Sequence, residues 1–84
     1  MSDYSLFLLP RGQKDMDRFG QKVLRQLLER VKSLAHDPRP PGSLKLTADE
    51  GYRLRSGDYR ILYRIDEEKK AVYIYRIKDR KDAY

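Results

Sequence analysis

GYRLRSGDYRILY, residues 51–63, decides the fold of this chain. Apolar and polar side chains alternate on both sides of a short break, and this period of two is typical of β-strands with one apolar face. The break is Ser56-Gly57-Asp58, a tight-turn sequence. The stretch therefore predicts two antiparallel strands joined by a turn, over residues 52–55 and 59–65.

The residues that follow extend this hairpin into a meander. Residues 66–70 are all charged and predict a polar hairpin loop, and residues 71–77 are β-branched and aromatic, which favours a strand. Just before the hairpin, residues 44–46 form a short apolar segment and residues 49–51 a turn. The second half of the chain is thus expected to contain a three-stranded antiparallel meander.

The residues before the hairpin predict one strand and two helices. Residues 4–9 indicate a buried strand that a proline stops, residues 11–13 a loop, and residues 14–19 a short helix. Apolar side chains recur at helical spacing over residues 23–35, which predicts an amphipathic helix of about 16 residues. Three prolines and a glycine within residues 38–42 end it. The predicted fold is α+β, with both helices packed on one face of a small twisted sheet.

Composition narrows the function. Nineteen basic and thirteen acidic side chains give a formal net charge of +6 over 84 residues, which favours a polyanionic partner, nucleic acid before an acidic protein. The chain has no cysteine and one histidine, so we expect no disulfide, no metal site and no small-molecule cofactor. There is neither a long apolar run nor a signal-peptide pattern. These features predict one cytoplasmic domain, residues 1–84, without a membrane partner.

Two faces of the predicted fold carry the positive charge. One is the polar side of the long helix, which we expect to be a solvated surface. The other is the sheet, where Arg53 and Arg55 lie two residues apart and therefore on one side of their strand, with Arg60 just across the turn. In a hairpin these guanidinium groups converge and repel one another unless an anion lies among them. The arginine cluster is therefore a candidate phosphate site.

Tyrosines are interleaved with these arginines. Six of the seven lie beyond residue 51. Basic groups mixed with aromatic rings are typical of surfaces that bind single-stranded nucleic acid. Tyr59 and Tyr63, however, fall at the period of two that favours the core of the sheet.

Three motifs resemble the RelE/ParE toxin superfamily and together span the chain. They are Asp37-Pro38-Arg39-Pro40 ahead of Leu44-Lys45-Leu46, the hairpin sequence itself, and the closing Asp79-Arg80-Lys81-Asp82-Ala83-Tyr84. The resemblance implies a small toxin that a cognate antitoxin, a small acidic protein from a neighbouring gene, holds inactive. In this superfamily the RelE branch cleaves mRNA in the ribosomal A site, and the ParE branch inhibits DNA gyrase.

The resemblance favours the RelE branch, because the chain is short and carries that branch's charged surface. It implies a metal-independent endoribonuclease that inhibits translation, with the ribosome and mRNA as partners. By position, the expected catalytic residues are Arg53, Arg55, Arg60, Arg80 and Tyr84. The expected RNA-binding residues beside them are Lys78, Arg76 and Lys45.

In such a reaction the RNA 2′-hydroxyl attacks the adjacent phosphate, and a cationic cluster stabilises the charge that develops. Arginine does not lose its proton in proteins, so Arg55 is a poor general base. Tyr84, Lys78 or a ribosomal RNA group must take that role, or the rate enhancement comes from positioning alone.

Two alternatives stay open from the sequence. The chain could be a ParE-like gyrase inhibitor without chemistry of its own, or an inactive toxin-derived module that only binds an antitoxin. Because the branches share a fold, the fold does not choose between them.

Overall fold

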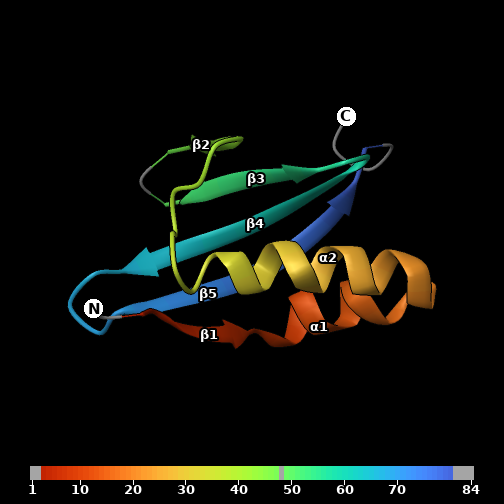
Figure 1. Ribbon diagram of the computed structural model, residues 1–84, viewed down its shortest axis with the longest axis horizontal. Helices are drawn as coiled ribbons and strands as arrows, with labels where there is room; N and C mark the ends of the chain where they lie inside the picture. The colour runs from red at the N-terminus through yellow and green to blue at the C-terminus, as the bar shows by residue number, and fades with distance from the viewer. Residues whose placement is uncertain (1–2, 48, 81–84) are drawn as a thin grey trace.

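The computed structural model describes residues 3–47 and 49–80, which fold into a five-stranded sheet with two helices on one of its faces (Figure 1). In chain order the elements are β1 (Ser5–Leu8), α1 (Pro10–Asp17), α2 (Gln21–Ser33), β2 (Ser43–Lys45), β3 (Tyr52–Ser56), β4 (Tyr59–Asp66) and β5 (Ala71–Asp79). The predicted α+β class and the order of its elements are confirmed. No helix within the described residues is long and apolar enough to cross a bilayer.

The sheet has the strand order β1-β5-β4-β3-β2. The predicted meander is present as β3, β4 and β5, each antiparallel to its neighbour. Two strands extend it: β2 adds an antiparallel partner to β3, and β1 pairs with β5 in parallel. A parallel pair needs a long crossover connection, and here the helices and the meander lie between the two strands in the sequence.

The first helix begins earlier than predicted. The structure places Pro10 at the first turn of α1, so residues 11–13 are helical rather than a loop, and the helix ends at Asp17. Proline suits this position because its fixed φ matches a helix and its missing N–H would have no partner there. The strand before it is not buried as predicted. Phe7 is 46% exposed, because β1 is an edge strand and the outer side of the sheet has no covering layer.

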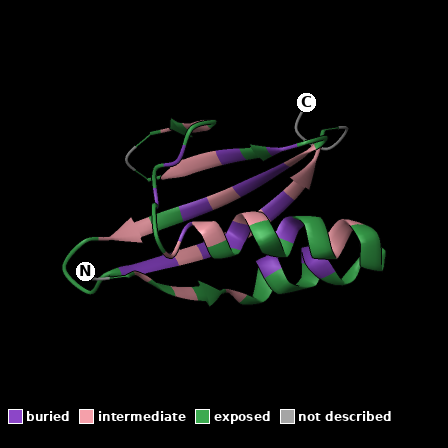
Figure 2. Ribbon diagram, viewed as in Figure 1, coloured by how far each residue is buried: buried purple, intermediate pink, exposed green. Residues whose placement is uncertain are grey.

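The hydrophobic core lies between the helices and the sheet (Figure 2). Leu27, Val31 and Leu34 of the α2 region pack on the apolar side of β3, β4 and β5. Tyr63 is fully buried and Tyr59 packs against this core, so the interpretation of these tyrosines as core residues is confirmed. The opposite face of the sheet therefore remains available for polar side chains.

Candidate nucleic-acid interface

The outer face of the sheet, opposite the helices, holds a row of cations in register. Arg55 of β3 pairs directly with Arg60 of β4, and Arg60 pairs with Lys78 of β5. We call these three residues the cationic row. Directly opposed side chains on neighbouring strands have Cβ atoms about 4.5–5.5 Å apart, and like charges at that separation destabilise a sheet. The row therefore concentrates positive charge on the outer face of the sheet.

A second pair of arginines lies next to the row, two residues away from it along β3 and β5. Arg53 and Arg76 lie on either side of Leu62, with which both are in register. The Nε atom of Arg53 is buried and has no hydrogen-bond partner within the described residues. A buried donor left unpaired costs about 1–3 kcal/mol. Such a cost is typical of functional sites rather than of surfaces shaped for stability alone.

Arg60 is less accessible than the sequence suggests. A phosphate site needs accessible cations, and Arg55 is exposed, but Arg60 is only 8% exposed. Arg60 belongs to the middle strand of the sheet and is flanked in register by Arg55 and Lys78; a long side chain in such a position can bury its aliphatic stem. Substitutions at Arg60 therefore affect packing as well as charge, whereas substitutions at Arg55 affect mainly charge.

Lys45 does not join the site. It pairs in register with Tyr52, which lies two residues before the core residue Leu54 on the same strand. Paired residues share a face of the sheet, and so do residues two apart. Lys45 thus lies on the helix side of the sheet, away from Arg53, so the structure does not bring it together with the arginines, and its RNA-binding role stays a prediction.

The closing motif begins next to the site. The backbone N–H of Arg80 donates to the carbonyl of Asp58 at 2.7 Å, which places Arg80 beside the β3–β4 turn, close to the end of the cationic row. The prediction that Arg80 belongs to the cluster agrees with this position but its role stays a prediction. Tyr84 lies outside the described residues.

Asp15 supports the site, although no motif in the sequence marks it. Asp15 of α1 is buried, and its Oδ2 accepts hydrogen bonds from Arg76 Nε at 2.8 Å and from the Ile77 N–H at 2.9 Å. Burial raises the pKa of Asp15, but these hydrogen bonds and the nearby guanidinium charge outweigh it, so the pKa lies below its ordinary value. The carboxylate therefore stays ionised and orients Arg76.

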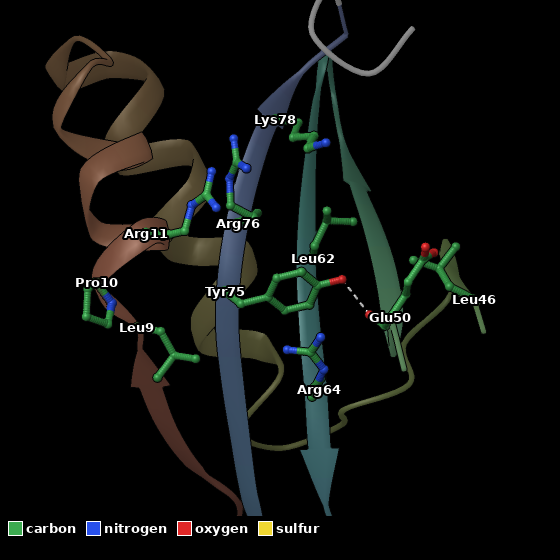
Figure 3. A pocket seen from close by; sticks show the side chains of 10 residues that line it. All are labelled: Leu9, Pro10, Arg11, Leu46, Glu50, Leu62, Arg64, Tyr75, Arg76 and Lys78. Atoms are coloured by element: carbon green, nitrogen blue, oxygen red, sulfur yellow. Dashed lines mark hydrogen bonds between the residues drawn. The ribbon is translucent and has the colours of Figure 1, made fainter. Parts of the chain in front are cut away.

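A pocket of about 670 Å³ opens on the same face, beside the cationic row (Figure 3). Ten residues line it, and Lys78 and Arg76 belong to both the pocket and the surface described above. Arg64 and Tyr75 form its floor, with the Arg64 guanidinium carbon 4.2 Å from the centre of the Tyr75 ring. Sequence reasoning missed both residues. Arg64 could have been found, because it continues the period of two through Arg60 and Leu62.

Tyr75 reaches this face through a β-bulge. The pairing of β4 with β5 shifts register between Leu62 and Tyr63, so that Leu62 faces Arg76 while Tyr63 faces Ile74. Tyr75 is the extra residue, and it lies beside Arg76 on the outer face. A strict period of two would have placed Ile74 outside, so the bulge also allows Ile74 into the core.

Within the described residues, no three His, Asp or Glu side chains gather as a metal-binding group. Among the described residues of this face, the groups at hand are clustered guanidiniums, one lysine amine and an aromatic ring beside Arg64.

The fold and the site together define a class of small, basic α+β domains with arginines gathered on an open sheet face. Within that class, the chain belongs to the RelE/ParE superfamily of toxins: residues 6–84 match the family described as "ParE toxin of type II toxin-antitoxin system, parDE". Toxin RelG of Mycobacterium tuberculosis is 29% identical over 83 residues, covering 96% of this chain and 95% of that protein. The predicted superfamily is confirmed.

Solved structures agree in fold. A chain of the M. tuberculosis toxin–antitoxin complex RelBE2 superposes with a TM-score of 0.84 at 27% identity, covering 98% of this chain and 97% of that one. The isolated RelE toxin of E. coli gives a TM-score of 0.73, also at 27% identity, covering 90% of this chain and 83% of that one. This chain is therefore similar to RelE-type toxins along nearly its whole length.

Proposed function

We propose that this toxin is a ribosome-dependent endoribonuclease that cleaves mRNA at the cationic row. The observation that carries the proposal is the registered row of Arg55, Arg60 and Lys78 on an uncovered sheet face. A row of this kind suits a phosphate whose charge increases during reaction, because preorganised cations stabilise that charge without reorganising. The cost of keeping like charges together is then offset when the anion binds.

The proposed reaction begins when the 2′-hydroxyl of one nucleotide attacks the next phosphate. The hydroxyl proton leaves, a dianionic phosphorane forms, and the departing 5′-oxygen gains a proton. In the row, the two arginines hold the phosphorane and remain charged throughout. Lys78 is the one member whose residue type can exchange a proton, and Tyr84 remains the other candidate in this chain.

We also propose that the ribosome completes the site. Classical ribonucleases use His or Glu for the proton transfers, and no such pair lies in the cationic row. The isolated protein should therefore hardly cut free RNA but should cut the message on programmed ribosomes. Ribosomal RNA would supply the missing proton acceptor and hold the scissile nucleotide in line for attack.

The proposed protein partner is an acidic antitoxin. The solved relatives include complexes of RelE-type toxins with antitoxins. A net charge of +6 favours association with an acidic chain, and electrostatic steering would make that association faster at low salt.

Primer extension on a translated message, after induction of the toxin, tests the proposal. The wild type should produce cuts within reading frames, and Arg55→Gln should reduce cutting on programmed ribosomes by about 10²-fold or more. Arg25→Gln removes the same charge from the exposed side of α2 and should cut like the wild type. Equal cutting by Arg55→Gln and wild type, with both folded by circular dichroism, would remove the cationic row from the mechanism.

A gyrase inhibitor is the second candidate, because the matching family is described as ParE toxins. In that case induction should cause DNA breaks with no cuts in messages, and purified toxin should also block supercoiling by purified gyrase. The two assays run on the same induced cells separate the candidates.

A further inference from the structure

Two planar groups, the Arg64 guanidinium and the Tyr75 ring, form the floor of the pocket beside the cationic row. The Arg64 guanidinium lies over the Tyr75 ring at 4.2 Å, and Arg64 Nε donates to the Asp49 carbonyl at 2.8 Å. The Tyr75 hydroxyl donates to the Glu50 carbonyl at 2.5 Å. Both members of the stack are thus anchored to the turn between β2 and β3, as Figure 3 shows for Tyr75. A plane that is fixed before binding loses little entropy when a ligand lies on it.

The charges around this floor select an anionic occupant. Four basic side chains line the pocket, Arg11, Arg64, Arg76 and Lys78, against the single carboxylate of Glu50. Much of the remaining wall is apolar, including the Leu62 side chain, and suits contact with the apolar face of an aromatic base. An occupant that combines a flat ring with negative charge matches this lining, and a nucleotide has both.

The position of the pocket favours RNA over an acidic peptide. Lys78 belongs both to the pocket and to the cationic row, so a strand whose phosphate lies on the row continues directly into the pocket. Arg64 lies four residues from Arg60 along β4, about 13 Å, which a neighbouring nucleotide of the same strand can span. An acidic peptide would match the charge but has no need of a planar floor.

We infer that this pocket, the stacking pocket, holds the base of a nucleotide next to the cleavage point. The base stacks on the Arg64 guanidinium, and the nucleotide's phosphate lies within reach of Arg76 and Lys78. This inference rests on the proposed function for its ligand, single-stranded RNA. It adds a base-binding subsite beside the cationic row, and it makes Arg64 a base-binding residue.

An abasic scan tests the stacking pocket. The probe is an RNA octamer with 2′-O-methyl groups at every position, which removes the attacking hydroxyl, and affinity is measured by fluorescence anisotropy at one low salt concentration. In the wild type, one abasic position should lower affinity by about 5- to 150-fold, because stacking a base is worth ~1–3 kcal/mol. Arg64→Lys keeps the charge but loses the plane. It should lower affinity for the intact octamer by a similar factor and abolish the effect of that abasic position.

Two matched variants control this comparison. Tyr75→Phe breaks the hydrogen bond to the turn but keeps the ring against the Arg64 guanidinium, so it should lower affinity by less than Arg64→Lys does. An equal loss in the two variants would assign the effect to turn rigidity and overturn the stacking role of Arg64. Arg25→Lys, on the exposed side of α2, should bind like the wild type. The stacking pocket is refuted if Arg64→Lys binds the octamer like the wild type, or if it keeps the same sensitivity to the abasic position.

Cleavage on programmed ribosomes, measured in parallel, separates this inference from the proposed function. Normal cutting together with unchanged RNA binding by Arg64→Lys would overturn the stacking pocket alone. Failure of the wild type to cut any message would overturn the proposed function, whatever the octamer shows. If Arg64→Lys weakened binding of a purified acidic antitoxin and left RNA binding unchanged, the pocket would be a peptide site and the inference would be wrong.

Discussion

Removal of the Asp15 carboxylate should destabilise the protein more than any other single acidic substitution in α1. Its Oδ2 accepts from the Ile77 N–H at 2.9 Å and from Arg76 Nε at 2.8 Å. The pairing of β1 with β5 ends at Leu8 and Ile74, so the Ile77 amide lies beyond the last residue of the neighbouring strand. The carboxylate therefore takes the place of a missing strand partner at this edge.

The magnitude follows from these two bonds. A hydrogen bond to a charged group contributes about 1.5–3 kcal/mol, and an amide left buried without a partner costs a similar amount. The Arg76 side chain is 27% exposed, so water replaces part of its bond and the second contribution is smaller. We expect Asp15→Ala to lower the free energy of unfolding by about 2–4 kcal/mol. For a domain of this size that lowers Tm by on the order of 10–25 °C.

Asp17 provides the matched control. It lies two residues further along the same helix, is exposed, and accepts from Gln13 within that helix, so Asp17→Ala should change stability by less than about 0.5 kcal/mol. Urea unfolding followed by circular dichroism measures both variants, provided that the m-value stays constant. If Asp15→Ala and Asp17→Ala unfold at the same urea concentration at pH 7, the role assigned to Asp15 is wrong.

The same residue predicts a pH dependence with a defined sign. The pKa of Asp15 in the folded protein lies below its ordinary value of 3.8. Its contribution is therefore fully present well above pH 4 and is lost as the pH falls through the folded pKa. Asp15→Asn cannot titrate, so its urea midpoint should fall less between pH 5 and pH 2.5 than that of the wild type. Parallel decreases in both proteins would contradict this account.

Three further outcomes are expected. Gly51→Ala should lower Tm by several degrees, because φ is +80° there and a Cβ would overlap the Tyr63 carbonyl, at a cost of at least ~1–2 kcal/mol; an unchanged melt would refute the strain. Tyr63→Phe removes the donor to the Pro38 carbonyl, a 2.7 Å bond, and should cost about 1–3 kcal/mol in urea unfolding. Burial raises the pKa of Tyr63 to about 12, so wild-type stability should fall as the pH rises from 10 towards 12, and the Phe variant should lose less. Arg55→Gln should raise stability by about 0.2–1 kcal/mol at low salt by removing repulsion against Arg60; a gain that does not shrink in 1 M NaCl would argue against repulsion.

Patterns within a few neighbouring residues were enough to predict the hairpin and the α2 helix. The strands and turn of the hairpin follow from alternation and from a Gly-Asp turn, in which Gly57 adopts φ +60°, and both signals act within a few residues. The α2 helix follows from its apolar stripe in the same way. The start of α1 was misplaced because proline either stops an element or begins a helix. Here the Leu9 N–H still donates to the Ile74 carbonyl of β5 and the helix begins at the next residue, so contacts with a distant strand fix the boundary.

Sequence alone was enough for the α+β class, the three-stranded meander and the gathering of Arg53, Arg55 and Arg60 on one face. Alternation places Arg53 and Arg55 on the same side of their strand, and the short turn sets Arg60 opposite Arg55. The tertiary structure alone decided which other residues meet them. The length of β5 and its register place Lys78 in the cationic row, and the register of β2 places Lys45 on the opposite side of the sheet. The bulge beside Leu62 brings Tyr75 to the outer face. Register depends on contacts between segments that are distant along the chain, and a shift of one residue moves a side chain to the other face.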